Sequence, residues 1–152
     1  MDTTMDTNDN TPQQIVVKGR NVNVVPTFWV NQSLKMAQTV LHHPFNRIGL
    51  ITGPTGTGKT IAGHYIAQQL GGKRLCCYEG MSRTALAKAL IKALNNTEIS
   101  SHYNKLLGLL QNICSATNRL VVLDEANELD WPHLNTLRFL ADEASLTIIL
   151  VG

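Results

Sequence analysis

The sequence predicts an α/β fold in which helices cover both faces of an open parallel sheet. From residue 47 onward, short apolar runs suited to strands alternate with longer segments whose apolar residues have helical spacing. The run LVVL at residues 120–123 is continuously apolar, which is typical of a strand covered on both faces. At 152 residues, the chain has room for one domain with a core and not for a second full domain.

The part of the chain before the sheet divides into two regions. Residues 1–14 are polar and lack apolar periodicity, which predicts a disordered tail. Residues 15–46 are expected to hold an extended linker that lies against the core, and then a helix. That helix should begin at Asn31 or Ser33 and stop before Pro44.

Residues 47–152 are expected to form the core. Its strands are the short apolar runs at residues 47–52, 73–78, 119–125 and 145–152. Its first helix is expected at residues 59–70, directly after a glycine loop, and should end at Gly71 and Gly72. The remaining helices begin at side chains suited to N-caps: Ser82 for a helix through Leu94, Ser100 or Ser101 for one through about Thr117, and Asp130 for residues 131–144.

Composition and charge exclude several classes of protein. The net charge is +2 and only 16% of residues are charged, so no strong bias points to nucleic acid or a membrane surface. The longest apolar run, LTIILV, is far shorter than the roughly 20 residues that span a bilayer. The acidic N-terminus is unlike a secretory signal. We therefore expect a cytoplasmic protein without a membrane partner, whose three cysteines are reduced and pack as small hydrophobes.

The clearest motif is GPTGTGKT, which matches the phosphate-binding loop consensus at every fixed position and lies between an expected strand and an expected helix. Gly56 and Gly58 allow the backbone to turn its N–H groups toward an anion. Lys59 should reach the β and γ phosphates of ATP, and the Thr60 hydroxyl should bind Mg²⁺. The residues expected to bind ATP are Gly53, Pro54, Thr55, Gly56, Thr57, Gly58, Lys59, Thr60 and Ile61.

An acidic pair supplies what hydrolysis needs beyond phosphate binding. Asp124 stands at the carboxyl end of an apolar strand, where open α/β sheets place their ligands, and is expected to help hold Mg²⁺. Glu125 follows it and is expected to polarise the attacking water. With Lys59, Glu125 is the expected catalytic residue.

These motifs together resemble the AAA+ ATPases. More narrowly, the segments GPTGTGKT, YEGMSRTALAKALIKAL, LVVLDEANELD and LRFLADEASLTIILVG are similar to the branch that includes the phage Mu transposition protein B family and related transposon ATPases. The resemblance covers about residues 25–152. It implies strand order 5-1-4-3-2, assembly of the full-length protein into rings or filaments, often on DNA, and delivery of a transposase to target DNA.

The resemblance also implies parts that have no counterpart in this sequence. The polar sensor after the fourth strand, the fifth strand, the arginine finger, the second sensor and the helical lid are not found, so the core is expected to be incomplete at its C-terminus, with weak hydrolysis. Arg138 is interpreted as a solvated helix residue, or as one that faces a neighbouring subunit without catalytic work, and not as a finger.

Other interpretations remain open from the sequence. Bound ATP could organise a partner-binding surface in a nucleotide-controlled scaffold, and related secretion or replication ATPases share the same core. Phe28 and Trp29 are equally compatible with covering the adenine ring and with core packing. Basic residues on two expected helices suit either DNA phosphates or ordinary solvated faces; they are Arg83, Lys88, Lys92 and Lys105.

Overall fold

A four-stranded parallel sheet forms the centre of the protein in the computed structural model, which describes residues 11–116 and 119–152. The strands are β3 (Ile48–Ile51), β4 (Lys73–Cys76), β5 (Leu120–Asp124) and β6 (Thr147–Val151). Their order across the sheet is β3-β6-β5-β4. With β3 to β6 counted as core strands 1 to 4, this is the order 1-4-3-2, so that part of the expected order 5-1-4-3-2 is confirmed for the described strands.

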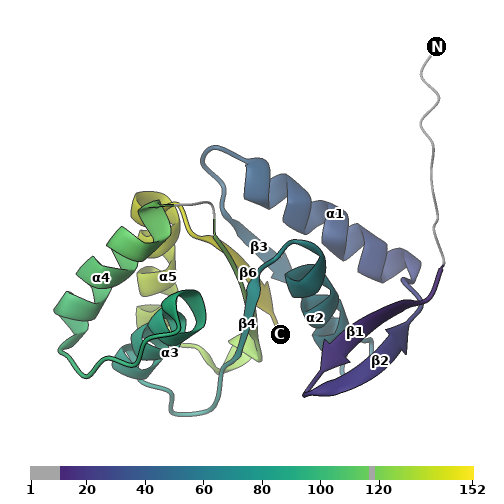
Figure 1. Ribbon diagram of the computed structural model, residues 1–152, viewed down its shortest axis with the longest axis horizontal. Helices are drawn as coiled ribbons and strands as arrows, with labels where there is room; N and C mark the ends of the chain where they lie inside the picture. The colour runs from purple at the N-terminus through teal and green to yellow at the C-terminus, as the bar shows by residue number, and fades with distance from the viewer. Residues whose placement is uncertain (1–10, 117–118) are drawn as a thin grey trace.

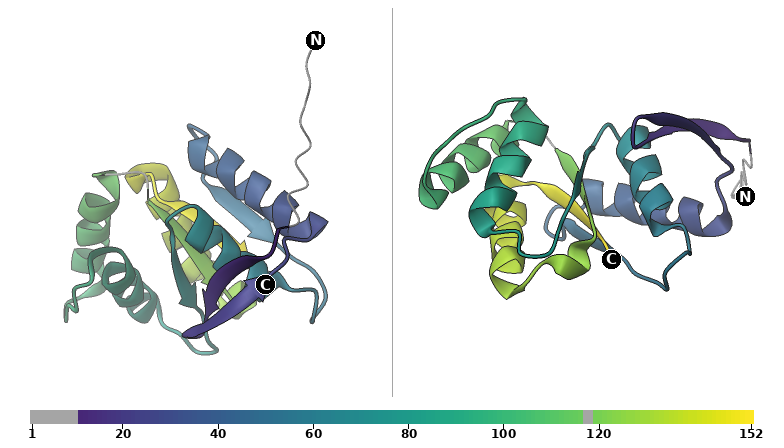
Figure 2. Two further views of the ribbon diagram at one scale, coloured as in Figure 1. Left: turned by 45° about the vertical axis from the view of Figure 1, so that its right-hand side comes forward. Right: turned by 90° about the horizontal axis from the view of Figure 1, so that it is seen from below.

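Helices cover both faces of this sheet (Figures 1 and 2). One face carries α1 (Phe28–His42) and α2 (Lys59–Gln69). The other carries α3 (Arg83–Asn95), α4 (Tyr103–Ser115) and α5 (Trp131–Ala144), with α4 packed on α3 and α5. The predicted fold class, an α/β fold with an open parallel sheet and helices on both faces, is confirmed.

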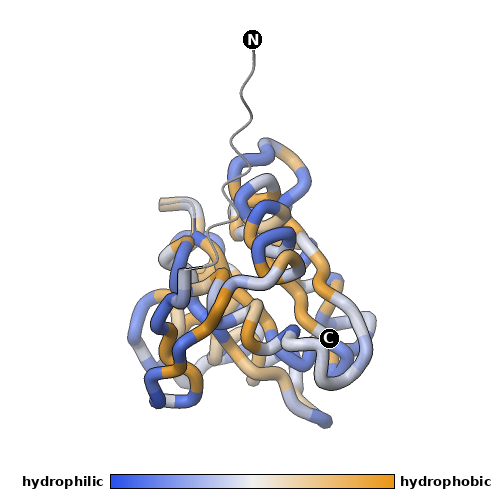
Figure 3. Tube along the Cα trace, turned by 90° about the vertical axis from the view of Figure 1, so that its right-hand side faces the viewer, coloured by the Kyte–Doolittle hydropathy of each residue, from blue (hydrophilic) through white to orange (hydrophobic). Residues whose placement is uncertain are grey.

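The apolar alternation along the strands explains the two-sided core. On β5, Val121 and Leu123 pack toward α3, α4 and α5, while Leu120 and Val122 pack toward α1 and α2. Successive strand residues point to opposite faces, so a strand buried on both sides must be apolar at every position. Figure 3 shows hydrophobic segments toward the middle of the trace and hydrophilic segments mostly at its outside.

The segment expected to be a linker folds into a hairpin. Strands β1 (Gln13–Val17) and β2 (Arg20–Val24) pair antiparallel, and the chain turns between them at Lys18 and Gly19, whose φ angles are 48° and 75°. Gln13 and Gln14, which were assigned to the disordered tail, belong to β1, while residues 1–10 lie outside the described residues. The fully buried Ile15 anchors this hairpin against the core.

The hairpin is also held to α2 by hydrogen bonds. The Gln68 side chain donates from Nε2 to the backbone oxygen of Gln14 at 2.9 Å and accepts from the backbone N–H of Val16 at 3.3 Å. The amide of Gln68 thus takes the place that a neighbouring strand would occupy along the outer edge of β1. The expectation that this segment lies against the core is confirmed, but its secondary structure was missed.

Helix caps decide which predicted helix boundaries are correct. Ser82 and Asp130 cap α3 and α5 as predicted, accepting from the backbone N–H groups of Ala85 and His133. The predicted start of α1 is wrong, because Thr27 caps it and the helix begins at Phe28. The predicted caps of α4 are also wrong: its N-cap is His102, with no side-chain cap bond, and Thr117 lies outside the described residues.

Candidate functional site

The glycine loop connects β3 to α2, and its backbone requires glycine at two positions. Gly56 and Gly58 have φ angles of 82° and 84°, in the left-handed region that side chains rarely adopt. No atom lies within 4 Å of the place where a Cβ would stand on either residue, so the space in front of the loop is open. Gly58 is the N-cap of α2, and the positive end of that helix therefore faces this space.

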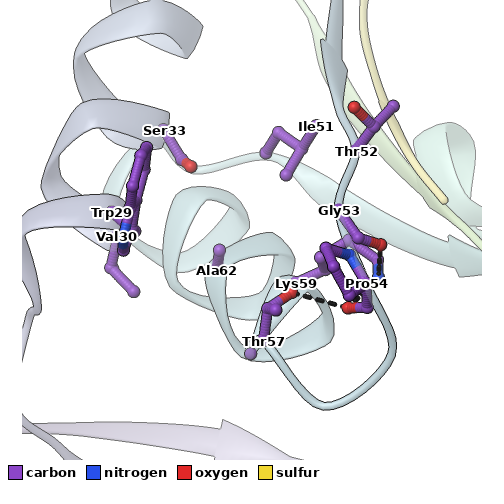
Figure 4. Close-up of a pocket in the computed structure, with 11 residues that line it drawn as sticks. Trp29, Val30, Ser33, Ile51, Thr52, Gly53, Pro54, Thr57, Lys59 and Ala62 are labelled. Carbon is purple, nitrogen blue, oxygen red and sulfur yellow. Dashed lines mark hydrogen bonds between the residues drawn. The ribbon is translucent and has the colours of Figure 1, made fainter.

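Lys59 is the first residue of α2, and its side chain folds back over the loop. Its Nζ donates to the backbone oxygens of Gly53 at 2.5 Å and Pro54 at 2.8 Å. The Thr57 hydroxyl donates to the same Pro54 oxygen at 2.8 Å (Figure 4). The loop is therefore held in shape by its own polar groups, and the Lys59 ammonium group lies beside the backbone oxygens at the start of the loop.

A cavity of about 570 Å³ brings the predicted phosphate and metal residues together. It lies between the loop, the first turn of α2 and the ends of β5 and β6. Its lining includes Thr60 and both members of the acidic pair, Asp124 and Glu125. The full set is Gly53, Thr55, Gly56, Gly58, Lys59, Thr60, Ile61, Asp124, Glu125, Asn127 and Gly152. The sequence reasoning missed Asn127, which follows the acidic pair by two positions.

The donor groups in this cavity fit ATP with Mg²⁺. Backbone N–H groups, a helix N-terminus and the Lys59 ammonium suit phosphate oxygens. A hydroxyl from Thr60 and a carboxylate from Asp124 are oxygen ligands of the kind that Mg²⁺ prefers when it also contacts substrate phosphates. Among the described residues, no group of three or more His, Cys, Asp and Glu side chains could hold a metal.

Asp124 is only 3% exposed, and both of its carboxylate oxygens are engaged. Its Oδ1 accepts the backbone N–H of Glu125 at 3.0 Å, and its Oδ2 forms an ion pair with Nη2 of Arg74 on β4. The sequence reasoning missed Arg74. The signal was present, because a basic residue interrupts the second apolar strand two positions before Cys76, the register partner of Asp124 in β5.

Glu125 stands at a turn where the backbone is strained. Its φ is 55°, in the left-handed region that is uncommon for a residue with a side chain, and it precedes the short helix η1 (Ala126–Glu128). The side chain is exposed and lines the cavity. Strain of this kind concentrates at functional sites, where surrounding structure over-determines an unfavourable conformation.

His64 lies on α2 near the Arg74–Asp124 pair. Burial, and then the positive charge of Arg74, lower its pKa, against opposing contributions from Asp124 and from the backbone of Val16. Its buried Nε2 atom has no hydrogen-bond partner among the described residues. The imidazole is thus kept neutral beside a guanidinium group.

A second cavity, of about 490 Å³, adjoins the other side of the loop. Figure 4 shows Trp29, Val30 and Ser33 of α1 facing Ala62 of α2 and the loop residues across it. Pro54 and Thr57, the predicted loop residues absent from the first cavity, line this one. Trp29 is 74% exposed, so the interpretation that it packs in the core is wrong.

Other predicted residues are placed as follows. Arg138 is a solvated helix residue, as predicted: its side chain is 75% exposed and forms an ion pair with Asp142 at 3.5 Å. All three cysteines are free thiols, but Cys76 is exposed, so its predicted packing is wrong. Burial raises the pKa of Cys77 and of Cys114 to about 11. No helix in the described part of the chain is long and apolar enough to cross a membrane.

Comparison with known proteins agrees with this geometry. A family model described as "AAA domain" matches residues 46–152, which is more than half of the chain and includes the whole four-stranded sheet, the glycine loop and the acidic pair. No curated protein matches the chain. The match does not identify the phage Mu transposition protein B branch.

Proposed function

Because the chain belongs to the AAA domain family of P-loop ATPases, we propose that it binds ATP with Mg²⁺ at the glycine loop and hydrolyses it with Glu125. The observation that supports this most directly is the shared cavity, where the loop, the Thr60 hydroxyl and the acidic pair line one space. These groups come from two stretches that lie far apart in the sequence. A phosphate-binding loop alone would not require the acidic pair beside it.

Each side chain has a distinct part in this proposal. The Lys59 ammonium turns from the loop carbonyls to the β and γ phosphates, while the loop N–H groups hold their remaining oxygens. Thr60 and Asp124 hold the cation, which supplies charge neutralisation for the phosphate oxygens. Glu125, which lines the same cavity, accepts a proton from the attacking water.

The cavity lined by Trp29 suits the adenine base. It lies directly beside the loop, so a nucleotide whose phosphates fill the first cavity can extend its base into the second. The large exposed ring offers a flat apolar surface for stacking. Trp29 and Phe28 already contact each other edge to face, with ring centroids 5.5 Å apart.

The wider role we propose is handling of target DNA or a transposase in DNA transposition, with self-association of the full-length protein. This proposal is supported by the similarity of four segments to transposon ATPases. Basic side chains on α3 and α4 are the candidate DNA contacts, although Lys92 is partly neutralised by its ion pair with Glu98 at 2.5 Å. A Lys88→Ala/Lys92→Ala double variant should reduce the slope of log DNA affinity against log salt by up to about two.

Replacement of Glu125 by Gln tests the proposed hydrolysis. The amide keeps the size of the side chain but cannot accept the proton, so phosphate release should fall by about 10² to 10⁴ while ATP binding persists. Glu128→Gln is the matched control, since Glu128 is an exposed carboxylate three residues away that does not line the cavity. If both variants release phosphate at the wild-type rate, Glu125 is not the base.

The same variant separates a motor from a nucleotide-controlled scaffold. In a motor, loss of hydrolysis should abolish the cellular function. In a scaffold, the ATP-bound state itself is active, and Glu125→Gln should retain or prolong that function. ATP binding measured alongside ensures that the two outcomes are compared in proteins that are equally loaded.

A further inference from the structure

The ion pair between Arg74 and Asp124 joins two neighbouring strands under the first turns of α2. Asp124 ends β5, and Arg74 lies two positions before its register partner on β4, so the two side chains meet diagonally on the same face of the sheet. The exposed fractions of the two side chains are 18% and 5%. Arg74 is not among the residues that line the phosphate cavity, so it contacts Asp124 from outside that cavity.

This pair matters because the same carboxylate is the candidate cation ligand. The Glu125 N–H donates to Oδ1 and the Arg74 guanidinium to Oδ2, so each carboxylate oxygen of Asp124 has a partner within the protein and its charge is balanced by the guanidinium. A buried carboxylate needs such a counter-charge, because desolvation strongly disfavours an unpaired ion. A divalent cation at Asp124 would therefore meet both an occupied oxygen and the repulsion of a fixed positive charge.

We propose that Arg74 is a positioning residue that competes with the divalent cation for Asp124. The site then holds the cation firmly only when nucleotide phosphates add their negative charge, and binds it weakly without nucleotide. This inference rests on the proposed Mg-ATP site.

The groups that face the pair agree with this assignment. On α2, His64 interacts electrostatically with both members of the pair, and burial, followed by the charge of Arg74, lowers its pKa, so its imidazole adds no second positive charge beside Asp124. The Arg74 Nε atom is buried and has no hydrogen-bond partner among the described residues, so Asp124 is the group that holds this guanidinium. Arg74 is thus attached to Asp124 by a single ion pair, in which another cation can replace the guanidinium.

Manganese binding tests the proposal with a readout other than activity. Free Mn²⁺ is measured by electron paramagnetic resonance in titrations of MnCl₂ alone and of MnCl₂ with ADP. Arg74→Met keeps the length of the side chain and removes its charge, and should tighten Mn²⁺ binding without nucleotide by about tenfold or more, the value of one charge-assisted hydrogen bond. Arg74→Lys keeps the charge and should stay close to the wild-type affinity.

Two controls define the contribution of the pair. Arg119→Met removes another partly buried arginine, one that donates to the backbone oxygen of Leu94 and whose Nε also has no partner among the described residues. Its Mn²⁺ affinity should equal that of the wild type. An Arg74→Met/Asp124→Asn double variant should lose the gain, because the carboxylate that benefits is gone.

Folding gives a second measurement, because Arg74→Met leaves a buried carboxylate unpaired. Its unfolding temperature should rise more with added Mn²⁺ than that of the wild type, since the cation replaces the lost charge. A variant that fails to fold both with and without Mn²⁺ overturns the proposal.

The outcomes also separate this inference from the proposed function. If wild-type protein with ADP binds no Mn²⁺, both fail. If wild-type protein binds Mn²⁺ with ADP, and Arg74→Met leaves the affinity unchanged in both titrations, only the competition by Arg74 is wrong.

Discussion

Replacement of Lys59 by Ala should weaken ATP binding by about one to two decades. In the structure, Nζ donates to two carbonyl oxygens of its own loop, at 2.5 and 2.8 Å, so the ammonium is already held at the mouth of the cavity. On binding, these neutral acceptors are exchanged for phosphate oxygens. A charge-assisted hydrogen bond contributes about 1.5 to 3 kcal/mol, which corresponds to roughly 10- to 150-fold in the dissociation constant.

The fold itself should tolerate this change. Lys59 is at the first position of α2, where alanine is a good helix former, and the two carbonyl oxygens that it leaves lie in an exposed loop that water can reach. The assay is calorimetric titration of ATP with Mg²⁺. Lys73→Ala is the control, because Lys73 is an exposed lysine on β4 that lines neither cavity. Equal ATP affinity in Lys59→Ala and wild type would refute the placement of the phosphates.

Three further predictions concern other parts of the molecule. ATP should quench or shift the fluorescence of Trp29. If the ring stacks on the base, Trp29→Ala should weaken the binding of adenine nucleotides by about 1 to 3 kcal/mol. An alkylating reagent at pH 8 should modify the exposed Cys76 well before the two buried thiols with pKa values of about 11, Cys77 and Cys114. Hydrogen bonding to His133 lowers the pKa of Asp130 in the folded protein. This cap therefore stabilises the fold fully at pH values above the usual pKa of 3.8, and the stabilisation is lost as the pH falls through the lower pKa of the folded state. In acid-unfolding measurements, the difference in stability between wild type and Asp130→Ala should shrink over that pH range.

The sequence predicted those features that depend on local pattern. The glycine loop was readable because its residue types are set by backbone geometry, as the positive φ angles of Gly56 and Gly58 show. The acidic pair was readable because it ends an apolar strand. The caps of α3 and α5 were readable because Ser82 and Asp130 bond within their own helices.

Features that depend on contacts between distant segments were missed. The hairpin of β1 and β2 is stabilised by Gln68, more than 50 residues further along the chain, and its sequence has no strong turn signal. Arg74 reads as a charge within a strand until the parallel register places it diagonally to Asp124. Trp29 was assigned to extended chain because the Thr27 cap was overlooked, and the cavity beside it arises only when α1 packs next to the loop.

The most direct test of the central claim is to observe where the nucleotide binds. Amide resonances of isotope-labelled protein can be followed by nuclear magnetic resonance during titration with Mg²⁺ and a non-hydrolysable ATP analogue. The account predicts the largest shifts at residues 53–61, at Glu125 and at the indole N–H of Trp29, because these groups line the two adjoining cavities. Saturable shifts confined to other surfaces, or no shifts at millimolar analogue, would contradict it.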